Sequence, residues 1–349
     1  MIKEGLFYST EKDNSVCCGL CPQSCIIADD CFGFCRVRSN KNGKLILPFY
    51  GSVSALAIDP IEKKPLYHFL PGTEIFSAGF TGCNFRCPFC QNWHISQDAQ
   101  ITHSSLKQML PQELVSAAMR IKSVSIAYTY SEPLVHAEYL LDCMALARKN
   151  GIANVLVTNG CINSNAAQKI LSLTDAVNID LKCFSRKTYT QILGGKGGDA
   201  AGNFMETVLD FITLAVSKKV HVEITTLIVP GINDNEAELE SCADFISSIN
   251  VPWHLSAYHP NHKWKAPATD PMFLKQIKSK AEKKISYVYT GNIFDESNNT
   301  LCNYCSSVLI QRTGYKTCID GLVKADEDQK YYHCKKCGQL TNIRFGIIL

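Results

Sequence analysis

Residues 74–91 read EIFSAGFTGCNFRCPFCQ, an apolar run followed at once by three closely spaced cysteines. The run Glu74–Phe80 has the length and composition of a β-strand. Cys83, Cys87 and Cys90 follow it with the spacing C-x3-C-x2-C. Because parallel α/β sheets carry their functional loops at the carboxyl ends of strands, we expect a metal-binding loop after the first strand of such a sheet.

Three thiolates at this spacing favour a 4Fe-4S cluster in which one iron stays open. Electron-transfer clusters usually have four cysteines in another rhythm, such as C-x2-C-x2-C-x3-C. An open iron can chelate a ligand that offers an amino and a carboxylate group. Two alternatives compete: a zinc site with His94 as the fourth ligand, or buried apolar cysteines without a metal. The position after a strand and the aromatic Phe89 before the last cysteine favour the cluster.

The middle of the chain alternates strand-like runs with segments of helical period, which predicts a parallel βα architecture. One predicted helix has an apolar face and stops at Gly151. That face comprises Leu134, Ala137, Leu141, Met144 and Ala145. The six predicted strands are EIFSAGF (74–80), VSIAYTY (124–130), ANVLVT (153–158), DAVNIDL (175–181), HVEITTLIV (221–229) and WHLSAY (253–258).

We divide the chain into a cysteine-rich N-terminal subdomain (1–50), a barrel (51–295) and a small C-terminal unit (296–349). Asn42-Gly43 predicts a hairpin turn in the first of these. The glycine-rich stretch 194–203 neither follows a strand nor has P-loop spacing, so we expect a loop there and no phosphate site.

Composition limits the expected partners and the expected cellular compartment of the protein. Lys and Arg exceed Asp and Glu by 35 − 32 = 3, which does not indicate a nucleic-acid or membrane partner. We find no signal peptide and no apolar run long enough to span a bilayer, so we expect a cytoplasmic protein. The 18 cysteines then indicate metal binding or catalysis, because the cytosol keeps thiols reduced.

Two further cysteine groups flank the predicted barrel. Paired C-x2-C knuckles near the C-terminus predict a tetrahedral zinc site, with rubredoxin-like iron or a second iron-sulfur centre as the alternative. The N-terminal group fits zinc and an auxiliary 4Fe-4S cluster equally well. We expect Cys17, Cys31 and Cys318 to be extra thiols, and Cys143, Cys161, Cys183 and Cys242 to lie in the core. The candidate ligands are Cys302, Cys305, Cys334 and Cys337 at the C-terminal site, and Cys18, Cys21, Cys25 and Cys35 at the N-terminal site.

These motifs resemble the radical S-adenosylmethionine (SAM) superfamily. The wider sequence is similar to the radical SAM proteins of the AmmeMemoRadiSam system, relatives of pyruvate formate-lyase activating enzymes. The resemblance covers nearly the whole chain and implies a partial (β/α)6 barrel of class α/β with small cysteine-rich metal-binding subdomains at both ends. Its motifs are CGLCPQSC, FCRVRSN, DPIEKKPLYHFLPG, GCNFRCPFCQNWHISQ, YTYSEPL, VTNG, NIDLK, TTLIVPGIND and YVYTGN.

The resemblance also implies site roles. Cys83, Cys87 and Cys90 would hold the cluster, and Asp180 and Lys182 would share in catalysis near the SAM carboxylate and ribose. The sequence departs from the family in having Tyr130-Ser131 for a Gly-Gly pair and Val157 for an Asp, and we leave His221, Glu223 and Thr225 unassigned. The implied SAM contacts are Phe89 on the adenine, Gln91, Ser131 beside the methionine, Glu132 on the amino group, Thr158, Asn159, Asp180, Lys182 and His259.

The implied activity is reductive cleavage of SAM to a 5′-deoxyadenosyl radical, which abstracts hydrogen from an unknown substrate, for which a protein or peptide is one candidate. The alternatives are activation of a glycyl-radical enzyme and a non-catalytic metal-binding interaction module. A low-potential donor, flavodoxin or ferredoxin, would be needed, because cluster potentials can reach about −700 mV. The resemblance also implies Memo-like and Ammecr-like partner proteins.

Overall fold

Eight strands form one sheet at the centre of the computed structural model, which describes residues 3–98, 100–194, 203–293, 298–325 and 330–346. The strand order is β16-β15-β14-β13-β12-β11-β9-β8, with β8 antiparallel to β9 and all other neighbours parallel. The sheet therefore has two edges and forms a partial barrel. Its strands are β8 (Ala55–Pro60), β9 (Glu74–Gly79), β11 (Ser125–Thr129), β12 (Ala153–Thr158), β13 (Ala176–Asp180), β14 (His221–Ile228), β15 (Trp253–Ala257) and β16 (Val288–Gly291).

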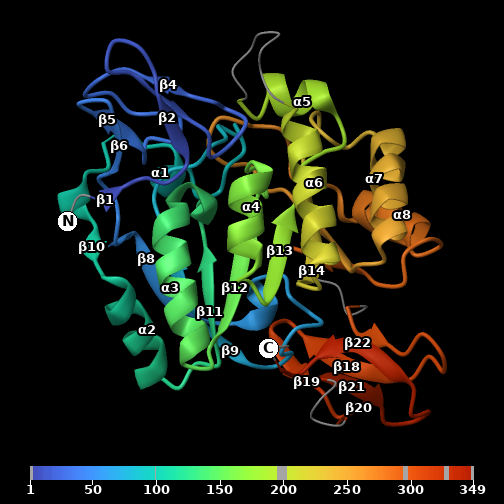
Figure 1. Cartoon of the computed structure of the whole chain (residues 1–349). Coiled ribbons are helices and arrows are strands. Elements are labelled where there is room, and N and C mark those ends of the chain that lie inside the picture. The colour runs from blue at the N-terminus through green and yellow to red at the C-terminus, as the bar shows by residue number, and fades with distance from the viewer. Residues whose placement is uncertain (1–2, 99, 195–202, 294–297, 326–329, 347–349) are drawn as a thin grey trace.

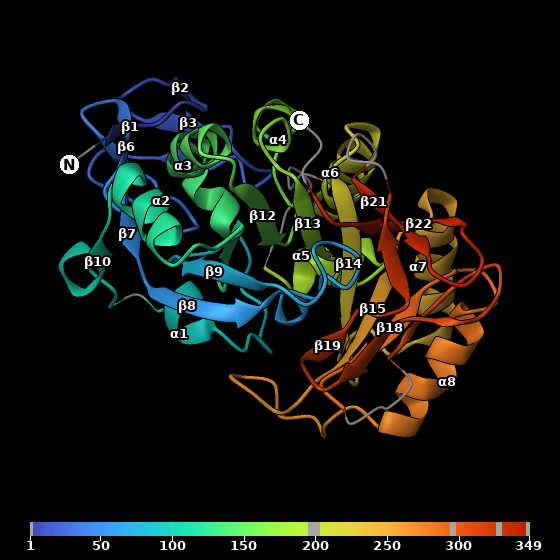
Figure 2. The ribbon, with the colours of Figure 1, turned by 90° about the horizontal axis from the view of Figure 1, so that it is seen from below.

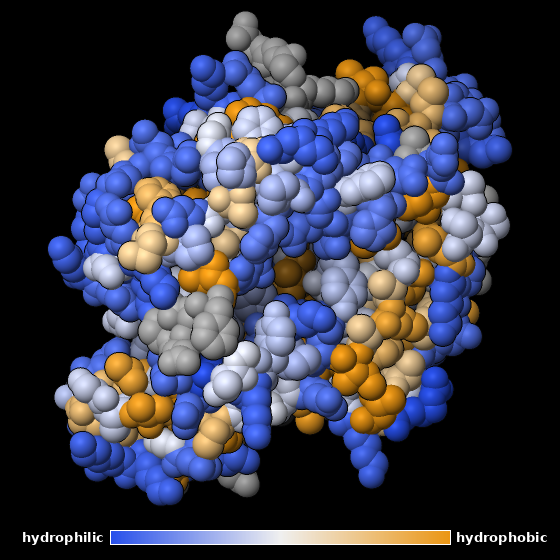
Figure 3. Space-filling model, turned by 180° about the vertical axis from the view of Figure 1, so that it is seen from behind, coloured by the Kyte–Doolittle hydropathy of each residue, from blue (hydrophilic) through white to orange (hydrophobic). Residues whose placement is uncertain are grey.

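Helices connect the parallel strands and cover the outer side of the sheet (Figures 1 and 2). Such crossovers arise because parallel strands need a long connection between the end of one and the start of the next. The side that the helices leave uncovered has a hollow near its centre (Figure 3). The helices are α2 (Pro111–Arg120), α3 (Ala137–Lys149), α4 (Ser164–Leu171), α5 (Arg186–Gln191), α6 (Phe204–Ser217), α7 (Glu236–Ile249) and α8 (Pro271–Ala281). No helix of the described ranges is long and apolar enough to cross a membrane.

The six predicted strands are confirmed, and the sheet contains two more. The seventh parallel strand, β16, has only four residues, and β8 runs antiparallel along the opposite edge. The predicted helical face needs correction. Leu134 lies in the 3-10 turn Pro133–His136 before α3, Ala145 is exposed and Leu141 is half-buried. The buried face of α3 instead includes Ala137, Leu140, Cys143, Met144 and Ala147.

The N-terminal segment forms two small antiparallel sheets that pack on the barrel. Asn42-Gly43 makes the predicted two-residue turn, since Lys41 pairs with Lys44 and both turn residues have positive φ. The buried side chains of this segment belong to the same hydrophobic cluster as those of the barrel. The strands are β1 (Lys3–Glu4), β2 (Tyr8–Thr10), β3 (Val16–Cys18), β4 (Ile26–Ile27), β5 (Ser39–Lys41) and β6 (Lys44–Leu47), while β7 (Ser52–Val53) pairs with β10 (Lys107–Gln108).

A buried ion pair fixes this segment to α3. Arg38 Nη1 and Nη2 lie 2.7 and 2.8 Å from the two carboxylate oxygens of Glu138, and both side chains are 1% exposed. Removing one partner leaves a buried charge uncompensated. We therefore expect Glu138→Ala to lower the free energy of unfolding by roughly 3–5 kcal/mol in urea titrations.

The control for this prediction is Lys3→Ala, which removes the exposed ion pair that Lys3 forms with Asp142, also on α3. Exposed pairs contribute about 1 kcal/mol or less. Equal losses in the two variants would show that burial of the Arg38–Glu138 pair does not have the expected energetic effect.

The C-terminal unit has a small core of its own and lies at the opposite end of the barrel from the N-terminal sheets (Figure 1). Arg344 exchanges backbone hydrogen bonds with the segment before β9, at His68 and Leu70, and its guanidinium donates to the carbonyl of Lys219 before β14. The unit therefore covers the amino ends of the strands. Its strands are β17 (Thr300–Leu301), β18 (Val308–Thr313), β19 (Lys316–Cys318), β20 (Leu322–Lys324), β21 (Tyr331–Cys334) and β22 (Leu340–Arg344).

Candidate active site

A pocket of about 250 Å³ opens at the carboxyl ends of the parallel strands. The loop after β9 supplies one wall with Cys83, Cys87 and Cys90, and the other walls come from the ends of β11 to β16. The predicted residues that line the pocket are these three cysteines with Phe89, Gln91, Ser131, Glu132, Asn159, Asp180 and Lys182. The lining also includes Phe85, Asn92, Ser96, Gln97, Tyr130, Thr225, Leu227, Ser256 and Asn292.

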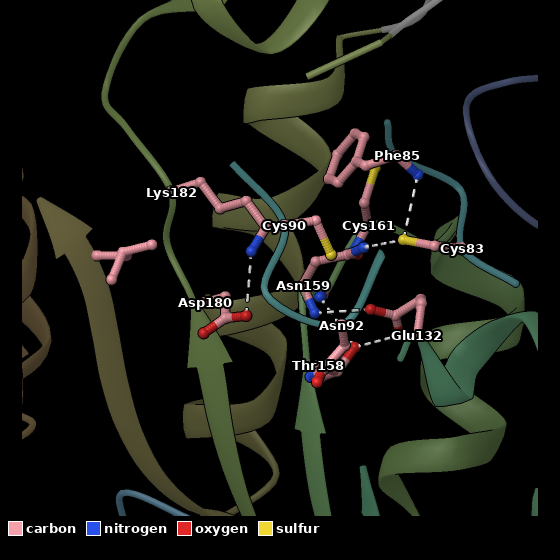
Figure 4. Close-up of polar contacts among 12 residues, drawn as sticks. Cys83, Phe85, Cys90, Asn92, Glu132, Thr158, Asn159, Cys161, Asp180 and Lys182 are labelled. Carbon is pink, nitrogen blue, oxygen red and sulfur yellow. Dashed lines mark hydrogen bonds and ion pairs between the residues drawn. The ribbon is translucent and has the colours of Figure 1, made fainter. Parts of the chain in front are cut away.

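The cysteine loop is held by contacts from several elements. Gln97 Nε2 donates to the carbonyl of Cys87 at 3.0 Å, and Asn84 Nδ2 donates to the carbonyl of Cys161 at 2.7 Å. Asn159 Nδ2 lies 3.8 Å from Cys83 Sγ (Figure 4). These contacts order the loop so that its thiols share one pocket.

The spacing of the three thiols argues against a single metal ion. Within the described ranges, only the C-terminal cysteines bring three or more potential ligand atoms within 4.8 Å of one another. His94, the alternative zinc ligand, is exposed and is not among the residues that line the pocket. Three separated thiols with no fourth ligand beside them fit a cluster that has an open iron.

Glu132 follows β11 and is buried at the base of the pocket. It accepts hydrogen bonds from Thr158 Oγ1 at 2.5 Å, from the backbone N–H of Asn159 at 2.8 Å and from that of Leu134 at 3.0 Å (Figure 4). Burial raises the pKa of Glu132 to about 7, although the hydrogen bonds from Thr158 and Asn159 act in the opposite direction. The carboxylate can therefore receive a cationic amino group, or accept a proton from one, near neutral pH.

Asp180 and Lys182 lie on the other side of the pocket, at the end of β13. Lys182 Nζ is 3.0 Å from Asp180 Oδ2 (Figure 4). Burial lowers the pKa of Lys182, but the Asp180 carboxylate and the Cys87 and Cys83 thiols together outweigh it and hold that pKa above its usual value. The ammonium group thus remains charged and faces the thiols, where it can pair with an anionic ligand.

Two predicted residues do not line the pocket. Thr158 lies beneath it and acts on Glu132 through its hydroxyl. His259 is exposed, and its Nε2 lies 3.1 Å from the carbonyl of Asn292, which does line the pocket. Depth along β14 separates the unassigned residues, which lie on one side of the strand: Thr225 lines the pocket, whereas Glu223 lies deeper and accepts hydrogen bonds from His221 and His254.

Tyr130 shows how the departure from the Gly-Gly pair is accommodated. Its backbone φ is +71°, in the left-handed region that favours glycine. The phenol donates to Asp59 Oδ2 at 2.6 Å, and Lys64 Nζ lies 2.6 Å from the same oxygen. These contacts hold a strained residue at the pocket wall, next to Ser131.

Comparison with known proteins assigns this pocket to a family. The chain is 38% identical over 348 residues to an uncharacterized protein of Methanocaldococcus jannaschii, with 98% of this chain and 99% of that protein covered. The sequence model described as the radical SAM superfamily matches residues 79–246, which include the cysteine loop and β9 to α7. The chain belongs to the radical SAM superfamily.

Other proteins are similar to this chain at lower identity. Pyruvate formate-lyase 1-activating enzyme of Escherichia coli is 26% identical over 208 residues, which cover 56% of this chain and 79% of that enzyme. A domain of pyruvate-formate lyase-activating enzyme from Bacteroides vulgatus has a TM-score of 0.39 at 19% identity, over 48% of this chain and 98% of that one. A radical SAM methyltransferase from Sphaerobacter thermophilus has a TM-score of 0.47 at 13% identity, over 63% of this chain and 66% of that one.

The pocket fits the cofactors that radical SAM membership implies. Three thiols that share one pocket suit a cluster with one open iron. The carboxylate of Glu132 and the Asp180–Lys182 pair line that same pocket, where they suit a ligand that carries both charges. Thr225 adds a buried hydroxyl without a hydrogen-bond partner, which an adjacent ligand could satisfy.

Substitution of Glu132 tests whether this pocket binds SAM. We expect Glu132→Gln to weaken SAM binding by about 10- to 100-fold, because hydrogen bonds to charged groups contribute roughly 1.5–3 kcal/mol. Cluster content should stay unchanged, since Glu132 is not a ligand. Equilibrium binding of SAM to the cluster-loaded protein measures the effect.

Thr158→Val is the control, because it removes only the hydroxyl that donates to Glu132. Its effect on SAM binding should be smaller than that of Glu132→Gln. Unchanged affinity in Glu132→Gln would remove this carboxylate from the site.

A separate metal-binding group lies in the C-terminal unit. The sulfur atoms of Cys302 and Cys337 are 3.7 Å apart, as are those of Cys305 and Cys334. All four lie within 4.8 Å of one another. Tetrahedral zinc with Zn–S bonds of about 2.3 Å needs thiolates at such separations. Cys318 is exposed and stays outside this group, as predicted for a spare thiol.

Proposed function

We propose that this protein cleaves SAM reductively and uses the resulting radical to abstract hydrogen from a protein or peptide. The observation that carries the proposal is the convergence of Cys83, Cys87 and Cys90 with Glu132 in one pocket. A three-cysteine cluster, when bound, supplies the electron that breaks the S–C5′ bond of SAM and leaves a 5′-deoxyadenosyl radical.

The residues of the chain bind, orient and shield the substrate of that reaction. Glu132 holds the amino group of SAM and can accept its proton at the carboxylate, because its pKa is about 7. Lys182 provides a fixed positive charge for the SAM carboxylate, with Asp180 positioning it. Phe89 is 4% exposed and offers an apolar surface for the adenine, which keeps water from the reacting carbon.

A second candidate function, activation of a glycyl-radical enzyme, is suggested by the similar proteins. Several similar proteins are pyruvate formate-lyase activating enzymes, so activation of a glycyl-radical enzyme remains the alternative. A large partner must then insert a loop into the barrel. Co-purification of a glycyl-radical enzyme with this chain would favour that alternative. Loss of all SAM binding in the cluster-loaded protein would instead support a non-catalytic metal-binding module.

The proposal also covers the C-terminal metal, the electron donor, the cellular location and the partner proteins. The C-terminal cysteines hold zinc, a low-potential flavodoxin or ferredoxin supplies electrons, and the reaction takes place in the cytoplasm. Memo-like and Ammecr-like proteins are its proposed partners, on the strength of the sequence resemblance.

Labelled SAM tests the binding mode on which the function depends. The cluster-loaded, reduced protein is mixed with SAM that carries nitrogen-15 in its amino group, and electron-nuclear double resonance is recorded. We expect a nitrogen-15 hyperfine coupling, because the open iron should bind the amino group. A loaded cluster that shows no coupling at saturating SAM would overturn the proposal.

A further inference from the structure

Four of the six N-terminal cysteines surround a small cavity next to the active site. Cys18, Cys21, Cys25 and Cys35 are each no more than 8% exposed and line this space. The other two N-terminal cysteines do not line it: Cys17 is half-buried and Cys31 is exposed. The structure thus brings to one cavity the same four thiols that the sequence spacing favours as ligands.

These four thiols are spaced unlike a mononuclear site. In the C-terminal unit, all four sulfur atoms lie within 4.8 Å of one another, as a single tetrahedral ion requires. In the described ranges, neither the N-terminal thiols nor the active-site triad gathers three ligand atoms that tightly. Both groups therefore have sulfur atoms spread more widely than a single tetrahedral ion requires. A cubane spreads its thiolates more widely than a single ion does, because four irons lie between them.

The walls of the cavity suit a buried anionic group. Arg38 lines it and is 1% exposed, and its Nε has no hydrogen-bond partner, while its other two nitrogens bind Glu138. The backbone N–H of Phe34 donates to Cys25 Sγ at 3.4 Å. An iron-sulfur cluster with four thiolate ligands carries net negative charge, and N–H donors and a guanidinium stabilise it in a buried site.

A single stretch of backbone separates the cavity from the active site. Asn84 lines the cavity, and the preceding residue, Cys83, lines the active-site pocket. Gln23 Nε2 donates to the carbonyl of Asn84 at 2.9 Å, and Asn159 Nδ2 donates to Asn84 Oδ1 at 2.8 Å.

The loops of the two sites also touch directly. A Cβ at Gly82 would lie 2.5 Å from the carbonyl oxygen of Cys35, so only glycine permits this approach. The two thiol groups therefore flank residues 82–84, and no helix or strand lies between them.

We propose that Cys18, Cys21, Cys25 and Cys35 hold a second 4Fe-4S cluster, which reduces the active-site cluster. Four thiolates occupy all four irons and leave no open position for a substrate, so this cluster carries electrons. In each transfer the second cluster passes from its reduced 1+ state to 2+, and the active-site cluster passes from 2+ to 1+. A low-potential flavodoxin or ferredoxin then reduces the second cluster again. The presence of the second cluster does not depend on the proposed function. Its role as electron donor to the active-site cluster does rest on that function.

The first test isolates the second cluster. The full chain with Cys83, Cys87 and Cys90 all replaced by alanine is reconstituted anaerobically with iron and sulfide. We expect about four irons and four sulfides per chain, and an electron paramagnetic resonance signal after reduction with dithionite. Loss of the SAM site would leave this result unchanged, so failure of the proposed function and failure of this inference can be told apart.

Two additions to that background complete the test. Adding Cys25→Ala should remove the complete cluster, whereas adding Cys31→Ala, at the exposed thiol outside the cavity, should not. Two zinc ions per chain and no iron in the starting variant would overturn the proposal. Mössbauer spectra of the wild-type chain give a second measurement, in which about eight irons per chain in two 4Fe-4S clusters are expected, and about four would contradict it.

The role of the second cluster is tested by reduction kinetics. In Cys25→Ala, which keeps the active-site triad, reduced flavodoxin should reduce the active-site cluster much more slowly than it does in wild type. A small photoreductant that diffuses into the pocket should keep its rate, which also shows that the triad still holds its cluster. Equal rates with flavodoxin in wild type and Cys25→Ala would overturn the role as electron donor.

Discussion

Cys87→Ala is expected to reduce formation of 5′-deoxyadenosine from SAM to background. Cys87 is 7% exposed and lies between the other two cysteines of the loop, so its loss leaves two thiols that cannot hold a 4Fe-4S cluster in the active site. Chromatography of the reaction after reduction with dithionite measures the product. The same variant should keep its C-terminal metal, because that site lies in a separate unit with its own core.

The matched control is Cys161→Ala. Cys161 is fully buried, and its backbone carbonyl accepts a hydrogen bond from Asn84 of the cysteine loop, but its side chain does not line the pocket. This variant should retain its cluster and form product. Product formation by Cys87→Ala at the wild-type rate would contradict the assignment of the active site.

Cys334→Ser is expected to unfold the C-terminal unit. Among the described residues of this unit, the buried core has only six members, two of which are cysteines of the metal site. Structural zinc contributes on the order of 10 kcal/mol or more to the folding of such units. Loss of zinc should therefore expose the chain beyond about residue 298 to limited proteolysis, and zinc content should fall from about one ion per chain to none.

Cys318→Ser is the control for the C-terminal site. Cys318 is exposed and does not belong to the four-sulfur group, so zinc content and protease resistance should match wild type. A Cys334→Ser protein without zinc that still resists the protease would show that packing alone folds this unit. The contacts of Asn342 and Arg344 with His68, at the amino ends of the strands, would then be sufficient.

The strands that carry the site could be predicted from sequence because each is a run of apolar residues between turn residues. The edges of the sheet could not. β16 is only four residues long, and β8 pairs antiparallel with β9 through a register that no local pattern reveals. Asn292, which follows β16, was therefore missed as a pocket residue.

Depth along the strand separates the residues that the sequence left unassigned. Thr225 lines the pocket, whereas Glu223, two residues earlier on the same side of β14, does not. The sequence could not show how deep each side chain lies in the barrel. Glu223 lies in a buried cluster with His221 and His254. His259 was placed by family resemblance alone, and the structure leaves it exposed beside Asn292.

Cysteine spacing in the sequence singled out four candidate ligands in each flanking group. At the C-terminus it did so because C-x2-C pairs tolerate few alternatives. The N-terminal segment has six cysteines in 19 residues, from Cys17 to Cys35, and the four candidates are the ones that line a cavity in the folded chain. What the sequence could not supply is the separation of the sulfur atoms, which is tight only in the C-terminal group of the described ranges.

The most direct test of the central claim is a single-turnover assay on the wild-type protein. The chain is loaded anaerobically with iron and sulfide, reduced with dithionite and mixed with SAM, and 5′-deoxyadenosine and methionine are quantified. We expect the two products in equal amounts, and neither without reductant. A fully loaded and reduced protein that binds SAM but forms no 5′-deoxyadenosine would contradict the claim that this pocket cleaves SAM.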